Sequence, residues 1–325
     1  MYGNRIAQTV AMLCWVGAVL APQAHAQPGS FLVEIGDPGT EPRVLKEVLE
    51  VGIDDIVVDY RTIPLAPADF PADVSAARQG SYRLYGPGAA HWGSARLSAA
   101  LGGADSRELY QWWLDCSQGK NIRKSISVIA LKRDGSEARR YNLLDCFPTR
   151  WDPGEYSPSL KTQTETLTVS VGRIELTTRA SDGSDDESGN VLLDIDAAET
   201  GGDVDGAWET WSGGEPMLIP RLTMPGAKYH TSTPGHKSVG EVTLRGPLTS
   251  GRKALCQWIT ETVQGKPWKR TVTVKEITKD GGAGKMSYNY FDCFPTRYVF
   301  PAFSASGTGN LYEEVHIKPI RLELQ

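Results

Sequence analysis

Histidine and cysteine are scarce in this chain of 325 residues, which contains five of each. It has neither the G-x-S-x-G sequence of many serine hydrolases nor the H-E-x-x-H sequence of many zinc enzymes. The cysteines lack the C-x-x-C spacing of a zinc knuckle, and the histidines beyond the N-terminal segment are scattered singly. These absences favour a protein that is not an enzyme and that uses no cofactor or metal ion.

An excess of positive charge is also missing. The chain carries 34 lysine and arginine residues against 39 aspartate and glutamate residues, for a formal net charge of −5. A nucleic-acid-binding domain usually has a strongly basic balance, so no nucleic-acid partner is predicted. Hydrophobic residues make up 40% of the chain and charged residues 22%, which is the composition of an ordinary globular protein.

Long hydrophobic runs are absent beyond the N-terminal segment, in which residues 10–21 are apolar. This run follows a start with one basic residue and precedes a small-x-small sequence at 24–26. The arrangement is typical of a secretory signal peptide over residues 1–26, cleaved between Ala26 and Gln27. A membrane anchor is the alternative, but about a dozen apolar residues are too few to span a hydrocarbon core of about 30 Å. We therefore expect a secreted or periplasmic protein with no transmembrane segment after cleavage.

The strongest pattern in the sequence is an internal repeat. Residues 145–150 read Asp-Cys-Phe-Pro-Thr-Arg, and the same residues recur at 292–297, each copy followed by an aromatic residue. The flanks repeat at nearly the same spacing, as in these pairs: Gln111-Trp112 with Gln257-Trp258, and Ile174-Glu175-Leu176 with Leu322-Glu323-Leu324. Such self-similarity over most of the chain indicates a tandem duplication of one folding unit.

The duplication predicts two domains, at 27–176 and 191–325. Between them, residues 177–190 contain four acidic residues, one basic residue, and several serines and glycines. Such a segment cannot bury enough apolar surface to fold, so we predict an acidic flexible linker. A calcium loop is the alternative, but the spacing of the acids does not fit the EF-hand pattern.

Each copy has the same predicted order of elements. It comprises an opening strand (31–35 or 191–195), an alternating strand (94–99 or 241–245), a helix, a hairpin with an Asp-Gly turn (134–135 or 280–281) and a closing strand (165–171 or 313–317). One helix among antiparallel strands predicts a mainly β protein: two tandem β-sandwich or partial-barrel domains, each with one packed α-helix.

The ends of these elements are also predicted from local signals. Ser106 and Ser250 are expected to cap the two helices, and Gly119 and Gly265 to end them in the left-handed conformation that glycine tolerates. The proline of the repeated segment is expected to end the return strand of the hairpin, because it has no N–H to donate to a neighbouring strand.

This order of elements resembles the tail-tube proteins of contractile-tailed bacteriophages and the tube proteins of related contractile injection systems. The resemblance rests on the opening strand, a Pro-Gly pair before the alternating strand, the helix with its glycine stop, the closing strand and a repeated motif. The motif has the form aromatic-Pro-x-Arg-aromatic and comprises Phe147, Pro148, Arg150 and Trp151 in the first copy, and Phe294, Pro295, Arg297 and Tyr298 in the second.

The resemblance implies a structural protein whose partner is itself. Subunits of that family form hexameric rings with an inner β-barrel, and the rings stack into a hollow tube. With two units in each chain, three chains would complete a pseudo-hexameric ring. A secreted β-sandwich binding module or adhesin that forms no tube is the alternative function.

Removal of the signal peptide would leave four cysteines, one in each helix and one in each repeated segment: Cys116, Cys146, Cys256 and Cys293. Helix and strand must pack together in each unit, so Cys116–Cys146 and Cys256–Cys293 are the expected disulfide pairs. However, Cys116 aligns with Thr262 and Cys256 with Tyr110, so the two helical cysteines lie on different parts of the helix face. Free buried thiols are the alternative.

Overall fold

The computed structural model describes residues 31–63, 84–132, 134–155, 163–178, 191–196, 204–222, 232–266, 269–277, 283–307 and 310–324. The predicted signal peptide, with its cleavage site between Ala26 and Gln27, lies outside these residues, as do positions 179–190 of the predicted linker. Among the described residues, no helix combines the length and the apolar character that a membrane span requires.

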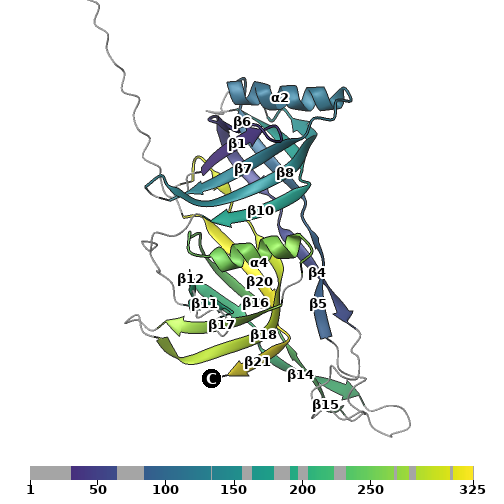
Figure 1. The fold of residues 1–325 in the computed structure, drawn as a ribbon, viewed down its shortest axis with the longest axis vertical. Coiled ribbons are helices and arrows are strands. Elements are labelled where there is room, and N and C mark those ends of the chain that lie inside the picture. Colours follow the sequence, from purple (N-terminus) through teal and green to yellow (C-terminus); the bar gives the residue numbers. More distant parts are fainter. Residues whose placement is uncertain are drawn as a thin grey trace, which may run out of the picture.

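The first half of the chain is a series of antiparallel strands with one helix (Figure 1). In chain order its elements are β1 (Phe31–Gly36), β2 (Arg43–Leu45), β3 (Val48–Ile53), β4 (Ile56–Ile63), β5 (Leu84–His91), β6 (Ser94–Ala100), α2 (Ala104–Ser117), β7 (Lys124–Leu131), β8 (Glu137–Asp152), β9 (Thr164–Ser170) and β10 (Arg173–Thr178). Strand β10 includes Thr177 and Thr178, so the first two positions assigned to the linker belong to the strand.

The second half repeats this order, which confirms the mainly β fold with one helix in each half. Its elements are β11 (Val191–Ile195), β12 (Val204–Trp208), β13 (Thr210–Gly213), β14 (Pro216–Leu222), β15 (Ser232–Val239), β16 (Val242–Pro247), α4 (Lys253–Val263), β17 (Arg270–Ile277), β18 (Ala283–Val299), β19 (Phe303–Ser304), β20 (Tyr312–Lys318) and β21 (Arg321–Leu324). Each element of the first half has a counterpart in this series, and the first-half positions that correspond to the short strand β19 lie outside the described residues.

The core of each half comes from strands that alternate buried and exposed side chains. Strand β6 buries Ala95, Leu97 and Ala99, and its counterpart β16 buries Val242 and Leu244. The intervening side chains point to the other face of the sheet, because successive residues of a strand alternate in direction. The predicted alternating strands therefore supply the inner face of each half.

Two long strands, β8 and β18, connect the sheets within the halves. The first part of β8 pairs with β7 and β10, and the part after Cys146 pairs with β9. β18 changes partners in the same way after Cys293, from β17 and β21 to β20. At both turning points an aspartate has a positive φ, 54° at Asp145 and 55° at Asp292, a conformation that aspartate tolerates better than most residues.

The expectation that proline ends the return strand is wrong. Both strands continue through the repeated segment, β8 to Asp152 and β18 to Val299. Pro148 and Pro295 each lie beside a shift in the pairing register, where one strand bulges. A bulge leaves a backbone group unpaired, so the missing N–H of proline is tolerated there.

The predicted helix caps are also wrong, whereas the predicted helix ends are confirmed. Helix α2 begins after Gly103, and Ser106 lies within its first turn, where its hydroxyl donates to Glu165. Helix α4 begins after Arg252, with Ser250 outside it. The glycines that follow the two helices have φ values of 90° and 75°, as their predicted role requires.

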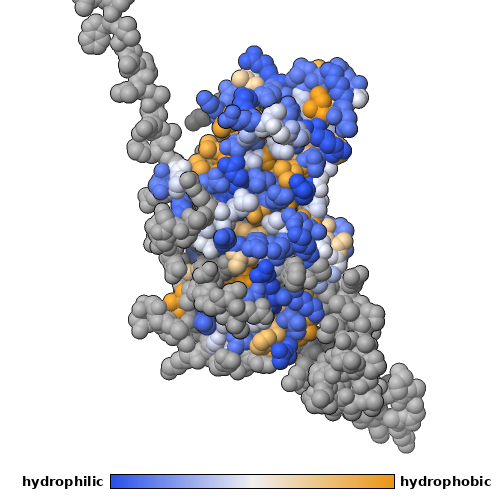
Figure 2. Space-filling view, in the orientation of Figure 1, coloured by the Kyte–Doolittle hydropathy of each residue, from blue (hydrophilic) through white to orange (hydrophobic). Residues whose placement is uncertain are grey.

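The two halves are joined by strand pairing as well as by the chain. β19 pairs with β3 of the first half, and β4 pairs with β18 of the second half. Figure 1 shows α2 at one end of the molecule, α4 between the halves, and the β14–β15 hairpin at the opposite end. Figure 2 shows a mostly hydrophilic face with small separate hydrophobic patches.

Candidate functional site

The junction between the two halves is built around helix α4. This helix of the second half packs on β10 of the first half. The backbone N–H of Leu176 donates to Oγ1 of Thr260 at 3.0 Å, and that hydroxyl donates to the carbonyl oxygen of Leu176 at 3.3 Å. Ile174 and Leu176 on β10 and Ile259 on α4 are buried. The last strand of the first unit, β10, is therefore the surface on which the helix of the second unit packs.

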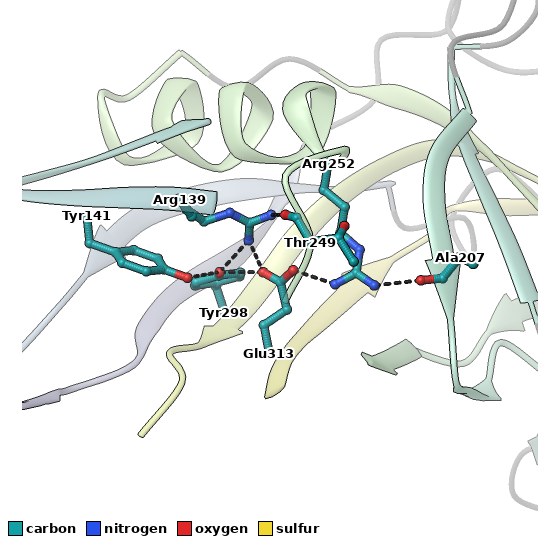
Figure 3. A network of polar contacts seen from close by, with 7 residues as sticks. All are labelled: Arg139, Tyr141, Ala207, Thr249, Arg252, Tyr298 and Glu313. Atoms are coloured by element: carbon teal, nitrogen blue, oxygen red, sulfur yellow. Dashed lines mark hydrogen bonds and ion pairs between the residues drawn. The ribbon is translucent and has the colours of Figure 1, made fainter. Parts of the chain in front are cut away.

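A buried ionic network crosses this junction (Figure 3). Arg139 on β8 of the first half and Arg252, just before α4, both pair with the carboxylate of Glu313 on β20. All three side chains are fully buried. A second guanidinium nitrogen of Arg139 donates to the carbonyl oxygen of Thr249 at 2.9 Å, and one of Arg252 donates to that of Ala207 at 2.6 Å. Backbone carbonyl groups thus add to the stabilisation of two buried cations that share one anion.

Two tyrosine hydroxyl groups complete the network. The hydroxyl of Tyr298, from the repeated motif, donates to Glu313 at 2.6 Å and accepts from Arg139 at 3.1 Å. It also lies 3.3 Å from the hydroxyl of Tyr141 on β8. The network therefore joins Arg139 and Tyr141 of the first half to Tyr298, Glu313 and Arg252 of the second. It holds β8 of the first half against β18 and β20 of the second.

The electrostatics of the network keep Glu313 ionised. Its burial by itself would raise its pKa, but the charges of Arg139 and Arg252 and the hydrogen bond from Tyr298 lower the pKa below its ordinary value. Burial raises the pKa values of Tyr298 and Tyr141, so both hydroxyls remain protonated at neutral pH. A carboxylate that is fully buried and bonded to two arginines is suited to joining two units rather than to transferring protons.

The β4–β5 arm of the first half adds a second contact. Strand β4 pairs with β18, with Val57 opposite Arg297 and Ile56 opposite Tyr298. Just before β4, the carboxylate of Asp55 accepts from Nε of Arg297 at 2.9 Å and from Nη2 at 2.5 Å, which raises the pKa of that arginine. A groove of about 900 Å³ runs between the arm and the second half. Within the described residues, no group of histidine, cysteine or acidic side chains in this groove or elsewhere is arranged to hold a metal ion.

Only the second copy of the repeated motif lies at this junction. There the structure buries most of its members and pairs its arginine with the arm: Phe294, Pro295, Arg297 and Tyr298. In the first copy, Pro148 is buried and Trp151 is partly exposed, but Phe147 is 37% exposed and the side chain of Arg150 is 73% exposed. The same motif is therefore a junction element in one half and a surface element in the other.

Sequence reasoning missed the three charged residues of the network. Glu313 has a counterpart in Glu165, which accepts a hydrogen bond from the Ser106 hydroxyl. Arg252 occupies the repeat position of Ser106, and Arg139 has no charged counterpart in the second half. The sequence signal that could have identified Arg139 and Arg252 is that each is replaced by an uncharged residue in the other copy, within segments where the two copies otherwise align.

The structure forms neither of the expected disulfides, Cys116–Cys146 and Cys256–Cys293, and all four cysteines are free thiols. Sγ of Cys116 donates instead to the carbonyl oxygen of Ile122 at 3.4 Å. Cys256 lies near Arg139 of the ionic network, whereas Cys293 lies on β18 beside β17. The helical cysteines therefore contact groups other than the strand cysteines, and the alternative of free thiols describes the structure.

Thiol titration of the chain starting at Gln27 is expected to find four free thiols in denaturant without reductant, but no rapid reaction at Cys146 or Cys293 in the native protein. Burial raises the pKa of Cys146 to about 12, which leaves about a thousandfold less thiolate than at the ordinary value of 9.0. Cys293 has a pKa raised even further by burial. A count of zero in denaturant would instead show two disulfides.

Comparison with protein families gives one match that covers more than half of the chain. The sequence profile described as T4-like virus tail tube protein gp19 matches residues 73–178 and 224–323, one range in each half. No curated protein matches the chain.

Several solved structures are similar to part of the chain. A chain in the cryo-EM structure of the anti-feeding prophage baseplate is 14% identical, with a TM-score of 0.36, over 46% of this chain and 94% of that chain. A chain in the sheath–tube complex of the extracellular contractile injection system PVC is 19% identical, with a TM-score of 0.35, over 42% and 88%. Hcp1 from Flavobacterium johnsoniae is 18% identical, with a TM-score of 0.27, over 45% and 94%.

Proposed function

The chain belongs to the family of T4-like virus tail tube protein gp19, and from this premise we propose that it is an exported structural subunit that assembles with copies of itself into rings or tubes. Its role is structural rather than catalytic. The signal peptide predicted at 1–26 supports export to the periplasm or beyond.

The observation that carries the proposal is the junction between the halves. It joins two unlike surfaces, the arm and β10 of one unit and α4 with β18 and β20 of the next. A contact between unlike surfaces can repeat from unit to unit, and it closes into a ring if the rotation between units allows it. Since each chain holds two units, a ring of six units would need three chains.

Electron microscopy of the chain starting at Gln27, together with its mass in solution, tests the proposal. We expect rings or hollow tubes, and a mass that is a multiple of the chain mass, with three chains in each ring. A ring with another number of chains would contradict the pseudo-hexamer while supporting self-assembly. A monomer across a wide range of concentrations would contradict self-assembly and favour a binding module or adhesin.

A further inference from the structure

Each half contributes a different surface to the internal junction. The first half contributes the β4–β5 arm and β10, and the second contributes α4 and the outer part of β18, residues 294–299. The repeat places counterparts of these surfaces at the two ends of the chain. The tail surface consists of β14–β15 and β21, and the head surface consists of α2 and the outer part of β8, residues 147–152. Figure 1 shows α2 at one end of the molecule and β14, β15 and β21 at the other, so the two surfaces cannot meet within one chain.

Both end surfaces lack strand partners that their counterparts have within the described part of the chain. Strands β14 and β15 pair only with each other, whereas β4 also pairs with β18. The outer part of β8 pairs with β9 alone, whereas the outer part of β18 lies between β20 and β4. A strand edge with unpaired N–H and C=O groups is a template for an added strand.

The ion pair of the internal junction has charged counterparts on both end surfaces. Asp55 directly precedes β4, and Glu215 directly precedes β14. Its partner Arg297 corresponds to Arg150 in the repeated motif. Glu215 is exposed, and the 73% exposed side chain of Arg150 pairs only with Asp152, two residues away at 3.1 Å, among the described residues. An acid on the arm and an arginine on the strand are therefore present in both copies, although a single chain brings only one such pair together.

The end surfaces also carry exposed apolar side chains. On the head surface, the ring of Tyr110 lies 5.8 Å from that of Trp113 and 5.2 Å from that of Trp151. Tyr110 is 41% exposed, whereas Cys256, at its repeat position on α4, is buried in the internal junction. On the tail surface, Met217 is 50% exposed, and Val57, its counterpart on the arm, is itself 43% exposed within the internal junction. Aromatic residues and methionine are enriched in the cores of protein interfaces.

The ionic network is the part of the junction that is not repeated. Met286 stands at the repeat position of Arg139, and Ser106 stands at that of Arg252. The Ser106 hydroxyl already donates to Glu165 within the first half. Separation of the two halves would leave the buried charges of the ionic network without partners. A contact between the end surfaces lacks this network, so its dissociation leaves no such charge unpaired.

We propose that the tail surface of one chain binds the head surface of a second copy of this chain. Strand β14 adds to the free edge of β8, with Met217 opposite Arg150 and Pro216 opposite Trp151. Glu215 forms an ion pair with Arg150 of the next copy. This contact deepens the proposed function and rests on it, because it is the step by which chains would join into a ring or tube.

Charge reversal tests this contact through variants Arg150→Glu and Glu215→Arg, separately and combined, in the chain starting at Gln27. Each single variant places like charges opposite each other, and we expect the dissociation constant for assembly to rise at least about tenfold. The double variant restores opposite charges, and its dissociation constant should return to within about threefold of the original. Lys46→Glu is the matched control, because Lys46 is exposed and lies outside both surfaces. Analytical ultracentrifugation measures assembly, and circular dichroism checks that each variant is folded.

The outcomes separate this contact from the proposed function. Rescue by the double variant supports the contact. Assembly of the original chain with no loss in the single variants, or with no rescue in the double variant, overturns the contact and leaves self-assembly standing. An original chain that stays monomeric at every concentration overturns both.

Discussion

Replacing Glu313 with glutamine is expected to lower the free energy of unfolding by about 3–5 kcal/mol, because it removes one partner from a buried ion pair. The change leaves Arg139 and Arg252 buried and facing a neutral amide. A guanidinium does not lose its proton in a protein, so the two cations then repel each other without a compensating anion. The hydrogen bond from Tyr298 also loses its charged acceptor.

Urea unfolding followed by tryptophan fluorescence measures this loss. The matched control is Glu165→Gln, because Glu165 is the counterpart of Glu313 and accepts from a serine hydroxyl instead of two arginines. We expect a loss of about 1 kcal/mol for the control, the usual net contribution of one hydrogen bond. Equal losses at the two positions would contradict the assignment of the network as the main polar link between the halves.

Acid is expected to remove the same link in the unmodified chain. The pKa of Glu313 is lowered in the folded state from its ordinary value of 4.5. A carboxyl group with a lowered folded pKa stabilises the fold fully above its unfolded pKa, and this contribution is lost as the pH falls through the folded pKa. Stability should therefore begin to fall below about pH 4.5 and continue to fall as Glu313 takes up a proton.

The Glu313→Gln variant isolates this contribution from other carboxyl groups. The groups that face Glu313 are Arg139, Arg252, Tyr298 and, more remotely, Tyr141, and none of them titrates in acid. The stability difference between the original chain and the variant should shrink as the pH falls from 6 to 3, as measured by urea unfolding at each pH. A difference that stays constant over this range would contradict the lowered pKa.

The repeat and most of the fold could be predicted because they depend on local patterns. Strand β11 runs from Val191 to Ile195 as predicted, and both helices end at the predicted glycines, Gly119 and Gly265. Alternating polarity and the left-handed conformation of glycine act over a few residues, so they can be read without knowledge of neighbours. The prediction that proline ends the strand also used only local information, and it failed because the bulge at Pro148 depends on the partner strand β9.

The sequence by itself determined that this chain is a tandem pair of β-rich units of the tail-tube type, since that conclusion needs only the repeat and the order of elements and motifs within each copy. Only the tertiary structure decided which copy of each motif is buried at the junction. Arg139, Arg252 and Glu313 lie far apart in the chain, and their charges can be buried only because the folded halves bring them together. The exposure of Arg150 and the burial of Tyr298 follow from the same cause. A single chain has one internal junction, so one copy of each surface is covered and the other remains at an end.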